Sequence, residues 1–457
     1  MNEQLISEIR IDGLFGLYSY TLPPEGKLTN AAILYGDNGI GKSTILRLVF
    51  HLLSGANNKG HRSALYSTEF KSLQVDLASG VSVKACREAD HPHVLTLSVS
   101  QGGANLAVWD YLPKSMGGEG DVYQHLPSGE IRVIRAKKQH VVPRSLSPGT
   151  EGEHAFYGAL AEHVPAIFIL NAERRLDSDS VPDPDDEMEL RRSMMYEEPK
   201  RIADMVVRAR EIALSQALST AGRWIARRAV QGANQGSTNV HTVYANVLRH
   251  LVDQPSRESL SLGESDIAAL MDRVDSVRAR TAMLAKYELE TPLDTAPVKD
   301  PILTSHGQTQ ALAVRLITPY IDGLESRLQA LEPIYKVTDR FVSLINSLLT
   351  DKIISFQLSH GFSIVNRLSG VLKPAQLSSG EQQLLLLFCY VLTARDKPSV
   401  FMIDEPEISL NIKWQRQLIQ SLLDVTDGAD IQFIFASHSL ELLSQHRNRV
   451  VRLETSA

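Results

Sequence analysis

One stretch of the chain combines glycines, a lysine and two hydroxyl residues at the spacing of a phosphate-binding loop. Residues 36–44 read Gly-Asp-Asn-Gly-Ile-Gly-Lys-Ser-Thr, which matches the pattern G-x-x-x-x-G-K-[ST]. The apolar run 31–35 predicts a buried strand before the loop, and apolar residues at helical spacing over 45–53 predict a helix after it. The motif requires this context, so a chance match is the weaker interpretation.

The residue types of this loop suit a nucleotide that carries Mg²⁺. Glycines let the backbone turn its N–H groups around phosphate oxygens, and the dipole of the following helix points to the same place. Lys42 can reach the β- and γ-phosphates, and the hydroxyl of Ser43 can hold Mg²⁺. The expected nucleotide contacts in the loop are Gly36, Asn38, Gly39, Gly41, Lys42, Ser43 and Thr44.

Two further apolar runs end in side chains that suit phosphate hydrolysis. The run 399–403 is followed by Asp404, placed to hold Mg²⁺, and by Glu405, placed to orient or deprotonate the attacking water. Pro406 is expected to hold Glu405 in extended geometry. A later run ends near His438, which reaches the same site if the two strands are neighbours. Without the phosphate loop, solvated residues at strand ends would be the simpler interpretation.

A serine-bearing turn precedes a strongly apolar helix. Residues 377–383 read Leu-Ser-Ser-Gly-Glu-Gln-Gln. Ser378 with Glu381, or Ser379 with Gln382, has the capping-box spacing that fixes the start of a helix. Taken alone, this segment predicts a capped helix and no site.

Composition limits the possible partners and location. The chain has 457 residues, 43% of them hydrophobic, and a formal net charge of −6. An acidic balance argues against a surface that coats nucleic acid overall, but it leaves room for a local basic patch. Cys86 and Cys389 can form neither a disulfide framework nor a cysteine-based zinc site, which favours the cytoplasm. We expect no signal peptide and no membrane span.

The order of patterns along the chain predicts an interrupted α/β domain. Alternating runs predict strands up to residue 35 and an antiparallel meander over 70–145, and helical spacing dominates 188–350. Pro319 and Pro333 are expected to kink or interrupt the last helical stretch. The absence of a sustained heptad repeat argues against a long coiled-coil arm. The expected parts are an N-terminal head segment at 1–175, a helical insertion at 176–350 and a C-terminal head segment at 351–457.

The sequence of motifs resembles the ATP-binding-cassette (ABC) ATPases. Phosphate loop, capped Ser-Ser-Gly helix, Asp-Glu strand end and Ser-His strand end follow one another as in the branch that includes RecF, the SMC proteins and the OLD nucleases. The resemblance covers about 1–175 and 350–457. It implies an α/β fold: a P-loop NTPase head of ABC type, with an antiparallel β subdomain and an inserted helical lobe.

The resemblance also implies roles for individual residues. Asp404 and Glu405 match the magnesium and catalytic carboxylates, and His438 matches the switch histidine. The segment 409–411 falls where a dimer-contacting loop would be, although Asn411 makes that match imperfect. The signature motif, which in this family binds the γ-phosphate of ATP held by another subunit, is matched by Ser378, Ser379 and Gly380.

Some family features have only candidate residues. Ser379 replaces the usual first glycine of the signature, and Glu381 replaces its glutamine. Gln74 and Arg174 are the candidates for the glutamine loop. A ring that stacks on adenine is expected among Phe15, Tyr18 and Tyr20, with ordinary strand packing as the simpler interpretation for any one of them.

Two carboxylates, Mg²⁺ and a phosphate cradle indicate hydrolysis of ATP. The resemblance implies a homodimer that shares its ATP sites, with a higher ring as an alternative. Heads of this kind resemble anti-phage defence ATPases such as AriA of PARIS or PtuA of Septu. The leading hypothesis is therefore a sensor that controls a separate effector, triggered by a phage protein or by nucleic acid. A RecF-like ATPase that binds DNA is the alternative, and a scaffold without hydrolysis is the third hypothesis.

Overall fold

The computed structural model forms two compact units. One comprises Met1–Glu197 and Ala394–Ala457, and the other comprises Glu198–Thr393. The residues described are 4–57, 59–88, 93–113, 122–125, 131–135, 138–142, 150–171, 176–178, 211–234, 264–368, 370–408 and 410–453. The three-part division expected from the sequence stays a prediction, although the second unit extends beyond residue 350 and takes in the capped helix.

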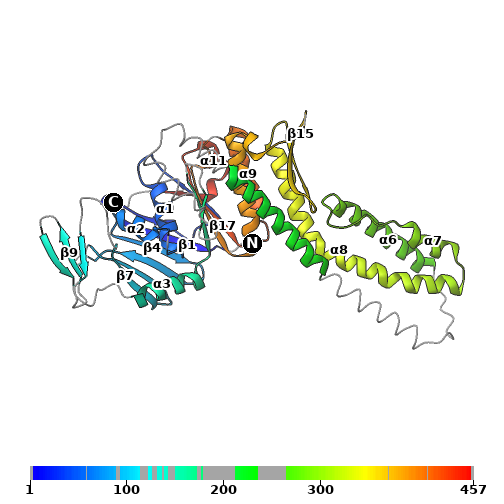
Figure 1. The fold of residues 1–457 in the computed structure, drawn as a ribbon, viewed down its shortest axis with the longest axis horizontal. Coiled ribbons are helices and arrows are strands. Elements are labelled where there is room, and N and C mark those ends of the chain that lie inside the picture. Colours follow the sequence, from blue (N-terminus) through cyan, green and yellow to red (C-terminus); the bar gives the residue numbers. More distant parts are fainter. Residues whose placement is uncertain are drawn as a thin grey trace. The chain divides into compact units, whose positions relative to one another are not determined.

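A six-stranded sheet forms the centre of the first unit (Figure 1). Its strand order is β12-β11-β16-β17-β3-β18, and only β12 runs antiparallel to its neighbour. Every residue of β16 and of β17 is buried, as expected for parallel strands covered on both faces. The strands are β3 (Ala31–Tyr35), β11 (Ala166–Leu170), β12 (Leu176–Ser178), β16 (Ser399–Asp404), β17 (Ile431–Ala436) and β18 (Val450–Arg452).

A second six-stranded sheet in this unit is antiparallel throughout, with the order β2-β1-β4-β5-β6-β7. The meander expected from the alternating sequence pattern is present, since buried positions alternate along β4 and β5. The strands are β1 (Ile6–Leu14), β2 (Tyr18–Leu22), β4 (Ser72–Leu77), β5 (Val81–Cys86), β6 (Leu95–Gln101) and β7 (Ala104–Tyr111). A separate three-stranded sheet contains β8 (Val122–His125), β9 (Ile131–Arg135) and β10 (Lys138–Val142).

Helix α1 (Lys42–Leu53) joins the two large sheets into one core. It contacts β11, β16 and β17 of the parallel sheet and β5 of the antiparallel sheet. Its apolar side chains belong to a single buried cluster that includes residues of both sheets. The other helices of this unit are α2 (His61–Ser67), α3 (Thr150–His163), α10 (Ile412–Val425), α11 (Leu440–Gln445) and the 3₁₀ turns η3 (Ala394–Asp396) and η4 (Arg447–Arg449).

A buried glutamine fastens the N-terminal strand to the parallel sheet. Gln432 on β17 is 0% exposed. Its carbonyl oxygen accepts from the N–H groups of Leu5 and Ile6 at 3.2 and 2.7 Å. Its amide donates to the carbonyl oxygens of Ile6 and Thr29 at 2.9 and 3.0 Å. One side chain thus satisfies four backbone groups that would be costly to bury unpaired.

The second unit is largely helical. Its elements are a helix over residues 211–234, α6 (Glu264–Ala285), α7 (Ala296–Thr304), α8 (Gln308–Leu348), a three-stranded sheet of β13 (Lys352–Gln357), β14 (Gly361–Asn366) and β15 (Gly370–Val371), the 3₁₀ turn η2 (Pro374–Gln376) and α9 (Ser379–Thr393). The glycine-bearing stretch 232–237 is of a kind that often breaks a helix, yet residues 232–234 are helical, and its remainder lies outside the described residues. None of the described helices has the length and apolarity needed to cross a bilayer.

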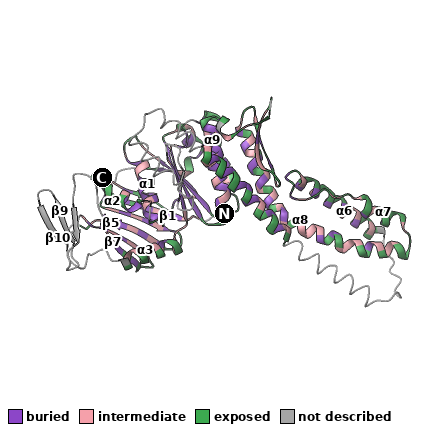
Figure 2. Ribbon diagram, in the orientation of Figure 1, coloured by how far each residue is buried: buried purple, intermediate pink, exposed green. Residues whose placement is uncertain are grey.

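Helix α8 runs for 41 residues through both Pro319 and Pro333. Of the two outcomes expected at these prolines, interruption of the helix does not occur, and a kink stays a prediction. A stripe of buried residues runs the length of α8, and Figure 2 shows buried and exposed positions alternating along it. Charged side chains also pair it with α6 and the turn that follows: Arg273 with Glu325, Arg280 with Glu332, and Lys286, just after α6, with Asp339. This packing outweighs the loss of one hydrogen bond at each proline. The residue numbers of the paired side chains increase in the same direction along both helices, so the two helices run parallel.

Candidate functional site

The carboxyl edge of the parallel sheet brings three sequence motifs together. Strands β16, β17 and β3 are consecutive neighbours and point the same way. The Asp404 strand end therefore lies one strand from the His438 loop and two strands from the phosphate loop. This edge is where open α/β sheets bind their ligands.

The phosphate loop has the left-handed backbone that its glycines permit. Gly39 and Gly41 have φ values of 88° and 98°. A Cβ atom on Gly41 would lie 2.6 Å from Leu14 Cδ2, so no other residue fits there without a shift. Lys42 begins α1, and its Nζ donates to the carbonyl oxygens of Gly36 and Asp37 at 2.8 and 3.0 Å. The loop therefore forms a tight turn before α1 with its lysine folded against it, and its role as a phosphate cradle stays a prediction.

Ser43 and Asp404, the residues expected to hold Mg²⁺, are in direct contact. The Ser43 hydroxyl donates to Asp404 Oδ1 at 2.7 Å. Asp404 is 6% exposed, and its burial raises the pKa of its carboxyl, against the opposing effects of Ser43 and the charge of Arg47. A hydroxyl and a carboxylate at the end of a phosphate loop are the oxygen ligands that Mg²⁺ prefers. These residues fit that ion.

Glu405 adopts a left-handed conformation with φ 48°, so the expectation of extended geometry was wrong. Its N–H donates to the carbonyl oxygen of Ala436 at 2.8 Å, and its own carbonyl oxygen accepts from the N–H of Ile408 at 3.1 Å. The pairing with β17 and the turn that follows thus fix its backbone. Proline favours extended geometry for the residue before it, and these contacts override that preference here. Non-glycine residues at such angles carry strain and cluster at functional sites.

The carboxylate of Glu405 meets His438 across the ends of β16 and β17. His438 Nδ1 lies 2.6 Å from Glu405 Oε2 and 3.6 Å from Glu407 Oε1. Burial raises the pKa of Glu405 to about 7, and the neighbouring Glu407 raises it as well. The two residues expected from separate strand ends are therefore side by side. Their catalytic roles stay predictions.

Glu405, Glu407 and His438 offer ligand atoms that lie within 4.8 Å of one another. Two oxygens of one octahedral ion, each about 2.1 Å from it, lie roughly 2.9 Å or more apart. The 2.6 Å between Glu405 Oε2 and His438 Nδ1 is shorter than that. As they lie here, the two side chains form a close pair of a carboxyl group and an imidazole, with their atoms nearer to each other than two ligands of one such ion would be.

The signature segment lies in the second unit. Ser378 and Ser379 are exposed, whereas Gly380 is buried. The N–H of Ser378 donates to Glu381 Oε2 at 2.7 Å, and the N–H of Glu381 donates to Ser378 Oγ at 3.4 Å. The capping box between Ser378 and Glu381 is thus confirmed. Lys352 Nζ also pairs with Glu381 at 2.7 Å, which holds the helix start in place.

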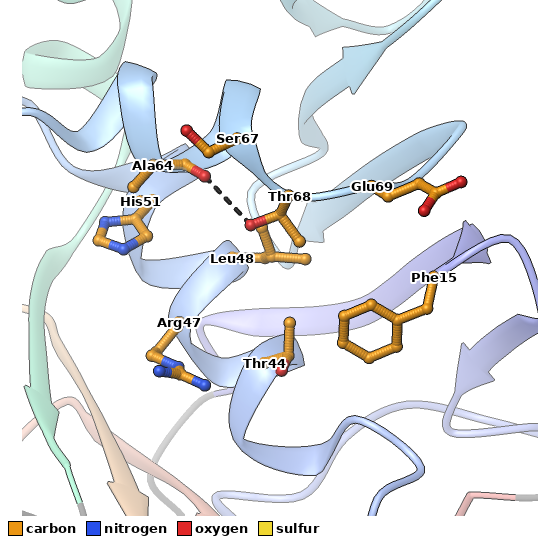
Figure 3. A pocket seen from close by; sticks show the side chains of 9 residues that line it. All are labelled: Phe15, Thr44, Arg47, Leu48, His51, Ala64, Ser67, Thr68 and Glu69. Carbon is orange, nitrogen blue, oxygen red and sulfur yellow. Dashed lines mark hydrogen bonds between the residues drawn. The ribbon is translucent and has the colours of Figure 1, made fainter. Parts of the chain in front are cut away.

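A cavity of about 510 Å³ extends along α1 from the phosphate loop (Figure 3). Its lining residues are Phe15, Thr44, Arg47, Leu48, His51, Ala64, Ser67, Thr68 and Glu69. Four of these recur at helical spacing on one face of α1. The Phe15 ring faces Thr44 across the cavity in Figure 3, and Phe15 has φ 55° and is 40% exposed. Tyr20 is instead 3% exposed and donates to the carbonyl oxygen of Ile40 at 3.1 Å.

A partly buried histidine, His51, lies at the far end of this helix face beside the buried His61. His51 Nδ1 and His61 Nδ1 are 2.9 Å apart. Burial lowers the pKa of His51 to about 4, with further lowering by His61, Arg62 and Arg47. Arg62 donates to the carbonyl oxygens of Leu52 and Ser54 at the end of α1, at 3.3 and 2.6 Å. His51 is therefore a neutral imidazole near pH 7.

Other candidate residues lie elsewhere. Gln74 donates to Asp76 Oδ1 at 2.9 Å on β4, and Arg174 lies outside the described residues. Asn411 caps α10 by accepting from the N–H of Trp414 at 2.9 Å, and Ser409 is not described. Sequence reasoning did not single out Glu407, although the second acid of Asp-Glu-Pro-Glu was its signal. It also missed the cavity residues 64–69.

Comparisons with known proteins match parts of the chain. Residues 289–444 match the family described as "AAA domain, putative AbiEii toxin, Type IV TA system". The lipoprotein-releasing ATP-binding protein LolD of Cereibacter sphaeroides is 38% identical over 82 residues, which are 18% of this chain and 35% of LolD. The molybdenum import ATP-binding protein ModC of Escherichia coli is 36% identical over 81 residues, 18% of this chain and 22% of ModC. The match thus spans about a third of LolD and a fifth of ModC.

The search of solved structures matched SMC heads with low TM-scores. The Smc head domain of Pyrococcus furiosus with an extended coiled coil, bound to the C-terminal domain of ScpA, has a TM-score of 0.33 and 12% identity, covering 97% of this chain and 92% of that one. The Smc head domain of Pyrococcus yayanosii with a coiled coil and joint has a TM-score of 0.34 and 13% identity, covering 100% and 98%.

The sheet order and the element order confirm the predicted fold class: an α/β P-loop NTPase head of ABC type, with an antiparallel β subdomain and an inserted helical lobe. The phosphate loop leads directly into the start of α1, which packs on the parallel sheet. LolD and ModC, which parts of the sequence match, are ATP-binding proteins. Over parts of its length the chain is therefore similar to ATP-binding proteins of ABC type and to that AAA domain family.

Proposed function

We propose that this protein is a Mg²⁺-dependent ATPase that acts as a dimeric switch. The observation that carries the proposal is the meeting of Ser43 with Asp404 and of Glu405 with His438 at one sheet edge. Phosphoryl transfer to water requires a loop that binds the phosphates, side chains that hold Mg²⁺ and a base that can accept a proton from water. The phosphate loop, the Ser43–Asp404 pair and the carboxylate of Glu405 beside His438 supply these parts.

The chain's own residues divide the work of hydrolysis. Lys42 exchanges its two carbonyl partners for phosphate oxygens, and Ser43 and Asp404 hold Mg²⁺, which would neutralise charge on the phosphates. Glu405 accepts the proton of the attacking water, for which its raised pKa suits it near neutral pH. His438 orients the Glu405 carboxylate from 2.6 Å.

The cavity beside Thr44 is the proposed place for the nucleobase. It adjoins the phosphate loop along α1, and the half-exposed ring of Phe15 offers a stacking face. Stacking on an aromatic ring contributes about 1–3 kcal/mol per base. Phe15 is therefore the proposed adenine-stacking residue among the three rings considered from the sequence.

A second copy of the chain is the proposed partner. The exposed Ser378 and Ser379 at the tip of α9 are available to ATP held by that copy, and the capping box keeps their backbone in place. ATP then joins two heads, and hydrolysis releases them. The buried Gly380 is part of the helix start and would act through its backbone.

The proposed cellular role is regulation of a separate effector in anti-phage defence. The match at 289–444 to a family described as a toxin of a toxin–antitoxin system supports a role in a system of that kind. The trigger would be a phage protein or a nucleic acid. The formal net charge of −6 gives no support to a RecF-like protein that coats DNA.

The deciding experiment measures both hydrolysis and mass. The wild type should hydrolyse ATP only with Mg²⁺, and Glu405→Gln should bind ATP, hydrolyse it at least about 100-fold more slowly and accumulate as a dimer. Lys42→Ala is the matched variant that should remain monomeric. Absence of hydrolysis in the wild type together with an ATP-bound dimer would favour the scaffold. Robust stimulation of the lone protein by DNA would favour the RecF-like alternative.

A further inference from the structure

Glu407 lies two residues beyond Glu405 and is buried, with 8% of it exposed. Its Oε1 atom accepts three hydrogen bonds from consecutive residues of the loop after β17. The donors are the Ser437 hydroxyl at 2.7 Å, the His438 N–H at 3.1 Å and the Ser439 N–H at 3.0 Å. Hydrogen bonds to a carboxylate are stronger than those between neutral groups. A single oxygen therefore fixes the backbone that carries His438.

Further hydrogen bonds of Ser437 and Ser439 hold the loop after β17. The N–H of Ser437 donates to the carbonyl oxygen of Leu34 at 3.2 Å, which joins the loop to β3. Ser437 Oγ in turn accepts from the N–H of Ser439 at 3.0 Å. Ser437 and Ser439 are hydrogen-bonded on either side of His438, and the backbone N–H of His438 is bonded to Glu407. The loop therefore directs the His438 imidazole toward Glu405.

Gln415 on α10 provides a second connection. Its Oε1 accepts from the Ser439 hydroxyl at 3.1 Å. Its Nε2 donates to the carbonyl oxygens of Glu407 and Leu410 at 3.3 and 3.0 Å. The segment after Glu405 and the histidine loop are thus connected through both Glu407 and Gln415, and Glu407 takes part in both links.

We propose that Glu407 is a positioning residue, which holds His438 against Glu405 and thereby sets the geometry of water attack. This inference rests on the proposed ATPase function. A side chain without an acceptor would leave the N–H of His438 and the buried hydroxyl of Ser437 without this partner, and the loop would shift to find others. Glutamine keeps an acceptor oxygen at the same reach, so it should preserve the loop, whereas alanine should not.

The test compares Glu407→Ala with Glu407→Gln in the full chain. We expect Glu407→Ala to lower kcat for ATP hydrolysis about 10- to 100-fold, since a displacement of about 1 Å has effects of that size. The KM for ATP should stay within about twofold, because no nucleotide contact is lost. Glu407→Gln should keep kcat within about fivefold. Glu441→Gln, which removes an exposed acid from the neighbouring helix, is the control and should match the wild type.

A readout independent of catalysis follows His438 itself. In protein labelled at the histidine Cε1 carbon, the signal that disappears in His438→Gln identifies the residue. That signal should move in Glu407→Ala and stay in place in Glu407→Gln, with the other histidine signals unchanged. If Glu407→Ala does not fold, Gln415→Ala replaces it, with a smaller shift in the same direction and a fall in kcat of about threefold.

The two readouts separate the inference from the function on which it rests. A wild type that does not hydrolyse ATP overturns the proposed function, while the His438 signal still decides whether Glu407 sets its position. An unmoved signal in Glu407→Ala, or in Gln415→Ala where that variant stands in, overturns the positioning role. So does a moved signal with unchanged kcat, or a Glu407→Gln variant as impaired as Glu407→Ala.

Discussion

Ser43 and Asp404 lie 361 positions apart in the chain, yet the hydroxyl of one donates to the carboxylate of the other at 2.7 Å. The contact exists because β16 and β3 are separated only by β17 in the parallel sheet. Both side chains therefore reach the first turn of α1, where a phosphate group would be bound.

Ser43→Ala should raise the Mg²⁺ concentration needed for hydrolysis by about 10- to 100-fold, because one oxygen ligand is removed. The measurement is a Mg²⁺ titration of the ATPase rate at saturating ATP. Ser444→Ala removes an exposed hydroxyl from α11 and is the matched control. An unchanged Mg²⁺ requirement in Ser43→Ala would argue that the ion is held elsewhere.

Phe15→Ala should weaken ATP binding about 10-fold or more, which corresponds to the loss of one stacked base. The KM for ATP should rise, while kcat at saturation should change little, because the phosphates are held by other residues. Leu17→Ala is the control, since Leu17 is 76% exposed and does not line the cavity. Equal effects of the two variants would place the base outside this cavity.

The stability of the first unit should depend on pH through His51. Its folded pKa of about 4 lies below the ordinary value of 6.5, so the unfolded chain binds the proton more readily between these pH values. The contribution is fully present above pH 6.5 and is lost as the pH falls toward 4. This change lowers the free energy of unfolding by about 3 kcal/mol, at 1.36 kcal/mol per pKa unit.

Urea unfolding between pH 4.5 and 7, monitored on the wild type and on His51→Gln, measures this effect. The variant should lose less stability over that range than the wild type. His154→Gln serves as the control, because the His154 side chain is exposed. Parallel pH profiles for all three proteins would contradict the neutral, partly buried imidazole.

Glu381→Ala should loosen the start of α9, because it removes both the reciprocal capping bond with Ser378 and the ion pair with Lys352. Loss of a cap destabilises a helix by about 1 kcal/mol. Glu381→Gln should preserve the cap and lose only the ion pair, since glutamine suits the third position of a capping box. Hydrogen exchange at the first turn of α9 measures the difference.

The same pair of variants also bears on the dimer. We expect ATP-driven association to survive in Glu381→Gln and to weaken in Glu381→Ala, where the serine-bearing tip is no longer fixed. Association that is equally strong in both would mean that this helix start is not needed at the interface.

Local patterns were sufficient to predict the main elements of the site. The phosphate loop, the strand that ends at Asp404 and the capping box at Ser378 are each encoded in a few consecutive residues. Their fold class followed from the order of motifs. The roles of the individual residues stay predictions until the variants are measured.

Features that depend on distant partners were not predictable. Glu407 receives its hydrogen bonds from residues 30 to 32 positions away, so its neighbours alone do not indicate its burial. The backbone of Glu405 follows the carbonyl of Ala436 rather than the preference before proline. Helix α8 continues through Pro333 because of its packing. In each case a tertiary contact overrode a local rule.

The amide of Gln432 has a consequence for how the protein is made. The start of β1 is hydrogen-bonded to the side chain of Gln432, which lies 426 positions later in the chain than Ile6. Strand β3 lies between β17 and β18 in the parallel sheet. A ribosome must therefore release most of the polypeptide before the first strands can take their final places. Until then the phosphate loop has no second strand beside it, so nascent chains should be unable to bind nucleotide.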